Sequence, residues 1–310
     1  MTDTQARADA AGSPTTPQLA LGAQFAARAE SAIHWLERQP ALDSLCQTLA
    51  GLFSSKVQPG PVKDLLSGTW LGHPLHPMLT DVTIGAWTSA LALDVVGGKS
   101  AAGGAETLMG IGVLSSVPTA LSGLSDLGDL GTEHERALGA AHAVGNLSAI
   151  ALFTTSYLAR KSGSRGLGFL LSLAGAGVMT GAAYLGGHLT FRRSIGVDHT
   201  ALEWRVDDWT PVCDEADLAE GEAKLVDAGG NDVMLYRSGS TICALADHCM
   251  HAGGPLHEGT VENGRVTCPW HASMFNLADG SLARGPATAP QPSYETRVQD
   301  GKVEVKARTF

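Results

Sequence analysis

The chain has 310 residues, which is enough for two domains of ordinary size. Its formal net charge of -10 argues against a nucleic acid as partner, because nucleic-acid-binding surfaces are basic. The charge is spread unevenly, and the middle of the chain contains almost none. Three of the five cysteines are scattered, and we expect buried thiols rather than disulfides at these positions: Cys46, Cys213 and Cys243.

The N-terminal region divides into a tail and a helical part. Residues 1–19 are rich in Ala, Thr, Asp and Pro, and they predict a disordered tail without a cleavable signal peptide. Within residues 20–70, apolar residues recur at helical spacing from Leu21 to Phe53, with a break at Pro40. This pattern predicts two short amphipathic helices, which either lie on a membrane surface or pack against the rest of the protein.

Four apolar segments in residues 71–195 predict a transmembrane bundle. Three of them contain no Asp, Glu, Lys or Arg and are long enough to cross a bilayer: Thr107–Ser125, Ala137–Ala159 and Gly166–Phe191. The first segment, Pro77–Val96, contains Asp81 and Asp94, but its place in the fourfold pattern favours a span there as well. The alternative is a very apolar soluble bundle, and uncharged runs above twenty residues disfavour it.

A short motif leads into the first of these segments. It is the stretch Gly72-His73-Pro74-Leu75-His76-Pro77, followed by Leu79, Asp81 and Trp87. The motif is similar to that of a family of predicted four-helix membrane domains of uncharacterised function. The resemblance implies the four-helix fold and nothing about activity.

Residues 205–310 consist of short alternating apolar runs separated by Gly and Asp. Such runs predict β-strands, and Asp300-Gly301 predicts a hairpin turn. The expected fold class is therefore α + β in separate domains, with a four-helix transmembrane bundle followed by a small antiparallel β domain.

The strongest chemical signal lies in this β domain. Cys249-Met250-His251 is followed, after sixteen residues, by Cys268-Pro269-Trp270-His271. Two thiolates and two imidazoles suit a closed zinc site or a Rieske [2Fe-2S] cluster, in which two histidines replace two cysteines on one iron. The pairs are unequal, Cys-x-His and Cys-x-x-His, which favours the cluster over zinc.

The residues around the four ligands add to this pattern. Gly259 follows Pro255-Leu256, Phe275 follows the second pair, and Gly285-Pro286 begins a third loop. Together they resemble a Rieske ferredoxin domain. The resemblance implies that Cys249 and Cys268 hold the buried iron, that His251 and His271 hold the outer one, and that the third loop covers the cluster.

The same resemblance implies the type of Rieske domain. The cluster loops lack the extra cysteine pair of respiratory Rieske proteins, so the domain is similar to the ferredoxin type, which tolerates a reducing compartment. Ser273 stands where high-potential relatives use a serine to tune the cluster, whereas Phe275 stands where they tend to have a tyrosine. We expect an intermediate to low potential, and we expect His248 and His257 to be exposed bystanders.

These observations predict a membrane-bound one-electron transfer protein with a Rieske [2Fe-2S] cluster. Only 39 residues follow His271 and none is histidine, so we expect no oxygenase catalytic domain of the kind that holds a second iron. The expected partners are redox donor and acceptor proteins or a quinone, within a lipid bilayer, and the Rieske domain is expected on the cytoplasmic side. The alternative is a redox or iron sensor in which the cluster state modulates the membrane domain.

Four histidines of the membrane part are expected near the side that carries the Rieske domain: His73, His76, His142 and His188. Ionisable residues within spans are costly and are functional candidates by default. Imidazoles on facing helices hold haem or metals in many bundles. We therefore hypothesise a b-type haem or another metal at His76, His142 and His188, with His73 as a further ligand. The alternative is that they anchor helix starts or hydrogen-bond to neighbouring groups.

Overall fold

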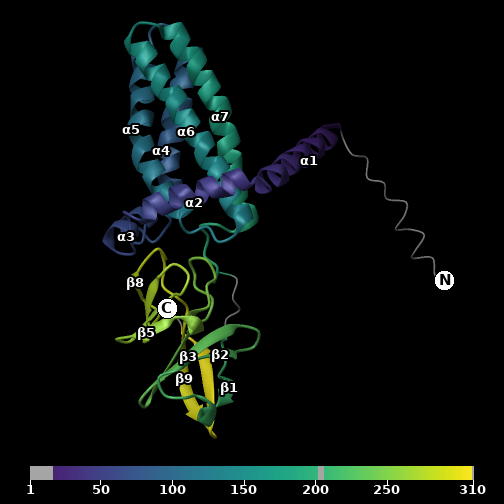
Figure 1. Cartoon of the computed structure of the whole chain (residues 1–310), viewed down its shortest axis with the longest axis vertical. Helices are drawn as coiled ribbons and strands as arrows, with labels where there is room; N and C mark the ends of the chain where they lie inside the picture. Colours follow the sequence, from purple (N-terminus) through teal and green to yellow (C-terminus); the bar gives the residue numbers. More distant parts are fainter. Residues whose placement is uncertain (1–16, 202–205, 309–310) are drawn as a thin grey trace, which may run out of the picture.

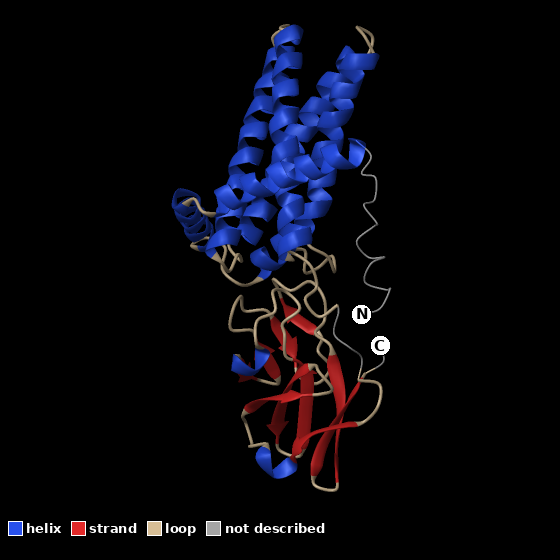
Figure 2. Cartoon of the chain, turned by 90° about the vertical axis from the view of Figure 1, so that its right-hand side faces the viewer, coloured by secondary structure: helices blue, strands red, loops and turns tan. Residues whose placement is uncertain are grey.

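The computed structural model describes residues 17–201 and 206–308, and the predicted N-terminal tail therefore lies outside the described residues up to residue 16. The long helices and the strands occupy opposite ends of the molecule, with a layer of loops between them (Figures 1 and 2). Two short 3-10 helices, η1 (Glu215–Asp217) and η2 (Leu256–Glu258), lie within the strand part. The expected fold class, α + β in separate domains, is confirmed.

Three helices precede the bundle; the second and third lie across its base, and the first projects sideways from it (Figure 1). They are α1 (Pro17–Glu37), α2 (Pro40–Ser54) and α3 (Pro61–Ser67). Each begins with a proline, which is favoured in the first turn because its missing N–H would have no intrahelical partner there. Helix α2 starts at the predicted break, whereas α3 was not predicted from the sequence.

The first two helices pack against the ends of the spans. Cys46 of α2 is buried with Leu127 and Ala140, and Ile33 of α1 is buried with Leu138. These contacts favour the second alternative for the short helices, packing against the protein. Several of their apolar side chains remain exposed, and these are Phe25, Trp35, Leu52, Val62 and Leu65.

Four long helices form the bundle. They are α4 (Leu75–Val96), α5 (Ala102–Leu127), α6 (Glu133–Lys161) and α7 (Arg165–Arg193). Each is long and apolar enough to cross a membrane. Large apolar side chains point outward, for example Leu114 at 75% exposure and Leu170 at 63%. An outer surface of this kind suits lipid, because lipid accepts apolar side chains that water does not.

The bundle is built from two similar hairpins, since α4 packs mainly against α5 and α6 mainly against α7. Trp87 of α4 stacks on Phe153 of α6, with ring centres 4.1 Å apart. Gly112 of α5 makes room for the Trp87 ring and Gly175 of α7 for the Phe153 ring. The sequence offset is 66 residues for the aromatic pair and 63 for the glycine pair, so the second hairpin repeats the first.

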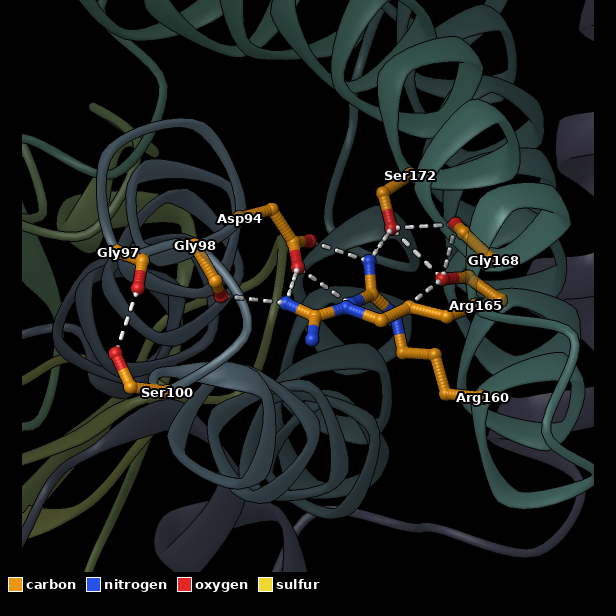
Figure 3. A network of polar contacts seen from close by, with 9 residues as sticks. Asp94, Gly97, Gly98, Ser100, Arg160, Arg165, Gly168 and Ser172 are labelled. Carbon is orange, nitrogen blue, oxygen red and sulfur yellow. Dashed lines mark hydrogen bonds and ion pairs between the residues drawn. The ribbon is translucent and has the colours of Figure 1, made fainter.

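At the end of the bundle far from the β domain, a buried ion pair joins the hairpins. Arg160 donates to both carboxylate oxygens of Asp94, at 2.9 and 2.6 Å, and Arg165 adds a contact at 3.3 Å (Figure 3). Ser172 of α7 accepts a further bond from Arg160. This arrangement explains how an aspartate is accommodated in an apolar helix, because its charge is paired and hydrogen-bonded.

Two antiparallel sheets make up the C-terminal domain. The larger has the order β1-β10-β9-β4-β3-β2 and the smaller β5-β6-β7-β8. The strands of the larger sheet are β1 (Thr210–Asp214), β2 (Ala223–Asp227), β3 (Asp232–Ser238), β4 (Thr241–Ala246), β9 (Ser293–Gln299) and β10 (Lys302–Ala307). Those of the smaller sheet are β5 (Thr260–Glu262), β6 (Arg265–Thr267), β7 (Met274–Asn276) and β8 (Leu282–Arg284).

The hairpin predicted at Asp300-Gly301 connects β9 to β10. Both residues have positive φ, 52° and 76°, as a type I′ turn requires. The small sheet and the loops beside it share one apolar core, which includes Leu256, Val266 and Phe275. That core supports the segments that carry the predicted cluster ligands.

Candidate iron–sulfur centre and its docking surface

The first ligand pair lies in the loop between β4 and β5. Gly253 donates its N–H to the Cys249 carbonyl at 2.7 Å, and Cys249 donates to the Gly254 carbonyl at 2.9 Å. Gly253 has φ of 76°, which glycine adopts without steric cost. This tight turn places Cys249 and His251 on one loop.

The second pair lies in the loop between β6 and β7. Ala272 donates its N–H to the Cys268 carbonyl at 3.1 Å, and Cys268 donates to the Ser273 carbonyl at 2.8 Å. Ala272 has φ of 61°, a conformation that residues other than glycine seldom adopt. The turn brings Cys268 and His271 to the same side of the loop.

The two loops meet with like ligands side by side. The thiols of Cys249 and Cys268 are in hydrogen-bonding contact, which raises the pKa of Cys249 and lowers that of Cys268. The ring centres of His251 and His271 are 5.0 Å apart. The structure therefore brings together all four predicted ligands, as one sulfur pair and one nitrogen pair.

The donor set fits a [2Fe-2S] cluster. Backbone N–H groups of the two loops point at the sulfur atoms, as thiolate ligands require. Burial lowers the pKa of both imidazoles, that of His251 to about 4, which favours the neutral form that binds metal. Nδ1 of His271 is buried without a hydrogen-bond partner in the described part of the chain, and an iron ligand satisfies such an atom.

The pairing of like ligands also fits two metal ions better than one. A [2Fe-2S] cluster has two irons, so each iron can take one pair. A single zinc ion must instead gather all four ligands around one centre. The predicted ligands Cys249, His251, Cys268 and His271 thus suit the cluster, which supplies one-electron chemistry when bound.

Two buried polar residues that the sequence analysis missed hold the first loop. Gln291 is fully buried and accepts the Met250 N–H at 3.0 Å, while its amide donates to the carbonyls of Ala246 and His248. Asp247 accepts from the backbone and the ring of His257, each at 2.8 Å. Only their burial and hydrogen bonds show that they hold this loop, because a glutamine or an aspartate in a loop is common and gives no such signal in the sequence.

The two bystander histidines differ in their surroundings. The His248 side chain is 49% exposed, as expected, whereas that of His257 is 25% exposed and bonded to Asp247. His257 therefore stabilises the loop instead of lying free on the surface.

The third loop, between β8 and β9, contacts both the cluster loops and the membrane domain. Ala287 donates its N–H to Ser273 Oγ at 3.0 Å. Gly285 donates to Asp64 Oδ1 of α3 at 2.9 Å, and Thr69 Oγ1 donates to the Ala287 carbonyl at 3.1 Å. A side chain at Gly285 would collide with Thr69, so glycine permits this close approach.

The outer histidine side of the cluster site faces the bundle. Nε2 of His251 lies 3.6 Å from Oδ2 of Asp129, in the connection between α5 and α6. The same oxygen accepts from Lys63 Nζ at 2.7 Å, and Lys63 also donates to the Ser125 carbonyl at 2.7 Å. The segment after α7 adds a third contact, because His199 donates its N–H to the Met250 carbonyl.

The predicted second site is only partly assembled. His76 and His142 meet across the bundle, with ring centres 6.3 Å apart. His188 is buried, but its charged neighbours are Glu30 and Glu37 of α1 and the arginines that end α7. His73 is exposed. The expectation that all four histidines share one site is therefore not met, because His188 faces α1 and His73 precedes the helix.

Comparison with known proteins supports the family resemblance of both domains. Residues 208–295 match the Rieske [2Fe-2S] domain, and residues 72–199 match the family described as predicted membrane protein (DUF2231). Ferredoxin CarAc of Metapseudomonas resinovorans is 34% identical over 98 residues, which are 31% of this chain and 92% of that protein. Apoptosis-inducing factor 3 of Mus musculus is 33% identical over 96 residues, and the chain spans only 16% of that protein's length.

A solved complex of reduced oxygenase and oxidized ferredoxin in carbazole 1,9a-dioxygenase also matches. The alignment has 31% identity and a TM-score of 0.31, and it covers 33% of this chain and 97% of the matched chain. From the ligand geometry and the sequence matches, we conclude that the chain belongs to the Rieske [2Fe-2S] family, with its Rieske domain joined to a DUF2231 membrane domain.

Proposed function

We propose that the protein is a membrane-tethered one-electron carrier that passes electrons between a soluble redox partner and its own membrane domain. One observation carries this proposal: the histidine side of the cluster site is docked on the bundle through the contact between His251 and Asp129. In a Rieske cluster the histidine-bound iron lies nearest the surface. A docked histidine side therefore favours transfer into the membrane part.

The relatives support electron transfer as the activity. Ferredoxin CarAc and the anthranilate 1,2-dioxygenase ferredoxin subunit of Burkholderia cepacia are named as ferredoxins. For this chain we propose a soluble donor that docks beside the second cluster loop. Trp270 is 57% exposed there, next to the ligand His271, and offers an apolar contact to such a partner.

The proposed location is an integral membrane protein with its Rieske domain in the cytoplasm. The absence of cysteine pairs in the cluster loops supports a reducing compartment. Helices α2 and α3, which carry the exposed apolar residues Leu52, Val62 and Leu65, lie at the bundle end next to the β domain (Figure 1). This placement suits the headgroup region of the bilayer.

A reoxidation experiment tests the proposal. The full chain is placed in lipid nanodiscs, its cluster is reduced with dithionite, and oxidation is followed with decylubiquinone or with ferricyanide. Gly285→Val separates α3 from the third loop, because the new side chain collides with Thr69 and Asp64. We expect this variant to slow oxidation by the quinone about tenfold and to leave oxidation by ferricyanide unchanged.

Thr241→Val serves as the control, since it places the same side chain at an exposed position of β4. It should behave like the wild type with either oxidant. Equal quinone rates for wild type and Gly285→Val, or a wild-type cluster that no membrane-soluble acceptor oxidises, would contradict electron transfer through the membrane domain. The latter outcome, with an intact cluster signal, would favour the sensor alternative.

A further inference from the structure

His76 and His142 occupy equivalent places in the two hairpins. His76 stands on α4 and contacts α5, while His142 stands on α6 and contacts α7. They are 66 residues apart, the same offset that separates the stacked rings of Trp87 and Phe153. The two imidazoles therefore meet where the repeated halves of the bundle face each other.

Each histidine is held by the same device. His76 Nδ1 bonds to the Thr119 carbonyl at 3.0 Å, and His142 Nδ1 bonds to the Ala182 carbonyl at 2.8 Å. A carbonyl can only accept, so Nδ1 carries the proton in both rings. Nε2 is then the atom with an available lone pair, which is the usual arrangement of a metal-binding histidine.

A glycine lies beside each ring, one helical turn after the carbonyl that holds it. A Cβ on Gly123 would come within 2.7 Å of the His76 ring, and a Cβ on Gly186 would come within 2.8 Å of the His142 ring. Gly123 and Gly186 are 63 residues apart, the same offset as the glycines behind the aromatic rings. The histidine, the carbonyl and the glycine are thus repeated as a unit.

The separation of the two rings fits coordination of one metal from opposite sides. A metal–nitrogen bond is about 2.0–2.1 Å, and a ring nitrogen lies about 1.2 Å from its ring centre, so two such imidazoles have centres roughly 6.4 Å apart. The observed distance is 6.3 Å, with the ring planes at 78°. Asn146 donates to His142 Nε2 at 3.0 Å, and a metal would take the place of this donor.

The number of available ligands favours an iron porphyrin over a bare ion. Among the described residues, His76 and His142 belong to no group of three or more His, Cys, Asp or Glu side chains that could hold a metal ion, so a bare ion at this place would have only these two ligands. A haem brings four nitrogens of its own and needs two axial ligands. We propose that His76 and His142 are the two axial ligands of a b-type haem held between the hairpins.

The location links this site to the cluster. Gly123 lies two residues before Ser125, whose carbonyl binds Lys63, and Lys63 binds Asp129 next to His251. Two helical residues span only about 3 Å along the axis. In the redox step, which rests on the proposed function, one electron leaves the reduced cluster and converts ferric haem to ferrous haem without making or breaking a covalent bond.

Optical spectra of the purified full chain test the haem site. Cells are supplied with iron and a haem precursor, and spectra are recorded before and after reduction with dithionite. We expect a Soret shift and an α band, and about one haem per chain. His76→Ala and His142→Ala should each lose at least tenfold of the bound haem, whereas His188→Ala and His73→Ala should retain it.

The Rieske paramagnetic resonance signal serves as the folding control in every variant. If an alanine variant loses that signal, His142→Met is measured in its place. A changed α band with retained haem in His142→Met then supports ligation of the haem iron by residue 142. Absence of haem bands in wild type that shows the Rieske signal, or unchanged haem in His76→Ala and His142→Ala, would overturn the assignment. If the protein binds haem but the quinone does not oxidise its cluster, the proposed function is contradicted, whereas the assignment of the haem site is supported.

Discussion

Nε2 of His251 lies 3.6 Å from Oδ2 of Asp129, so a carboxylate of the membrane domain faces a ligand of the Rieske cluster. The contact connects two parts of the chain that resemble separate families. It also gives the membrane domain a direct electrostatic influence on the cluster.

Removing that carboxylate charge should raise the reduction potential. The reduced cluster carries one more negative charge, and Asp129→Asn removes a nearby negative charge while Lys63 stays. We expect a rise of tens of millivolts, because the added electron would reside on iron beyond the imidazole ring, and a charge roughly 8 Å away acts with about 2 kcal/mol at an effective dielectric of about 20, where 59 mV is about 1.4 kcal/mol for one electron. Redox titration monitored by paramagnetic resonance measures it. Asp214→Asn on the remote strand β1 should leave the potential unchanged.

Ser273→Ala should lower the reduction potential. Ser273 is fully buried, and its Oγ accepts the Ala287 N–H, so its hydroxyl hydrogen can be donated toward the cluster. A hydrogen bond to a cluster sulfur stabilises the more negative reduced state. The same titration tests this prediction, with Ser240→Ala at an exposed position between β3 and β4 as the comparison. An unchanged potential would mean that Ser273 only holds the third loop.

The ion pair between Asp94 and Arg160 should be essential to the stability of the bundle. The Asp94 side chain is 4% exposed and that of Arg160 is 2% exposed (Figure 3). Asp94→Asn leaves the guanidinium buried without its counter-charge, and we expect a loss of about 3–5 kcal/mol. Thermal unfolding in detergent should show a much lower midpoint. Glu106→Gln breaks the exposed pair with Lys161 and should hardly move the midpoint.

Cys46 should be unreactive in the folded protein. Burial raises the pKa of its thiol to about 11, so almost none is ionised at neutral pH, and only the thiolate is a good nucleophile. Alkylation by iodoacetamide should therefore stay slow up to about pH 9 and increase toward pH 11. Mass spectrometry of labelled peptides measures it. Rapid labelling of Cys46 at pH 7 would show that α2 leaves the bundle.

The cluster ligands and the membrane spans could be predicted from the sequence because both depend on local chemistry. The spacing of Cys249, His251, Cys268 and His271 is fixed by two short turns, and an uncharged run must find an apolar environment wherever it lies. Asp81 and Asp94 weakened the prediction of a span at Pro77–Val96, and the sequence did not reveal that Asp94 pairs with Arg160, 66 residues further along the chain. A long-range pair of this kind leaves no local pattern.

Two of the histidines named as candidate membrane ligands, His76 and His142, lie close together in the structure. Depth along a helix follows from residue number, so the common level of His76, His142 and His188 could be predicted. The direction of a side chain around the helix depends on how helices pack, and packing turns His188 toward α1. The role of Gly123 and Gly186 could not be predicted either, because it follows from their close contacts with the rings of His76 and His142.

The contacts between the Rieske domain and the membrane domain could not be predicted from the sequence of either domain alone. Gly285 resembles an ordinary residue of the third loop, yet its lack of a side chain allows α3 to approach. The role of Gln291 in holding the first cluster loop likewise could not be predicted from the sequence. It becomes visible only in the structure, where the side-chain amide is buried and bonds to three backbone groups.

The most direct test of the central claim is paramagnetic resonance of dithionite-reduced membranes that contain the full chain. We expect the rhombic Rieske signal in the wild type, its loss in His251→Ala and in Cys268→Ser, and its retention in Gly285→Val. A spectrum typical of a cluster with four cysteine ligands, or no signal in membranes that contain iron-loaded protein, would contradict it.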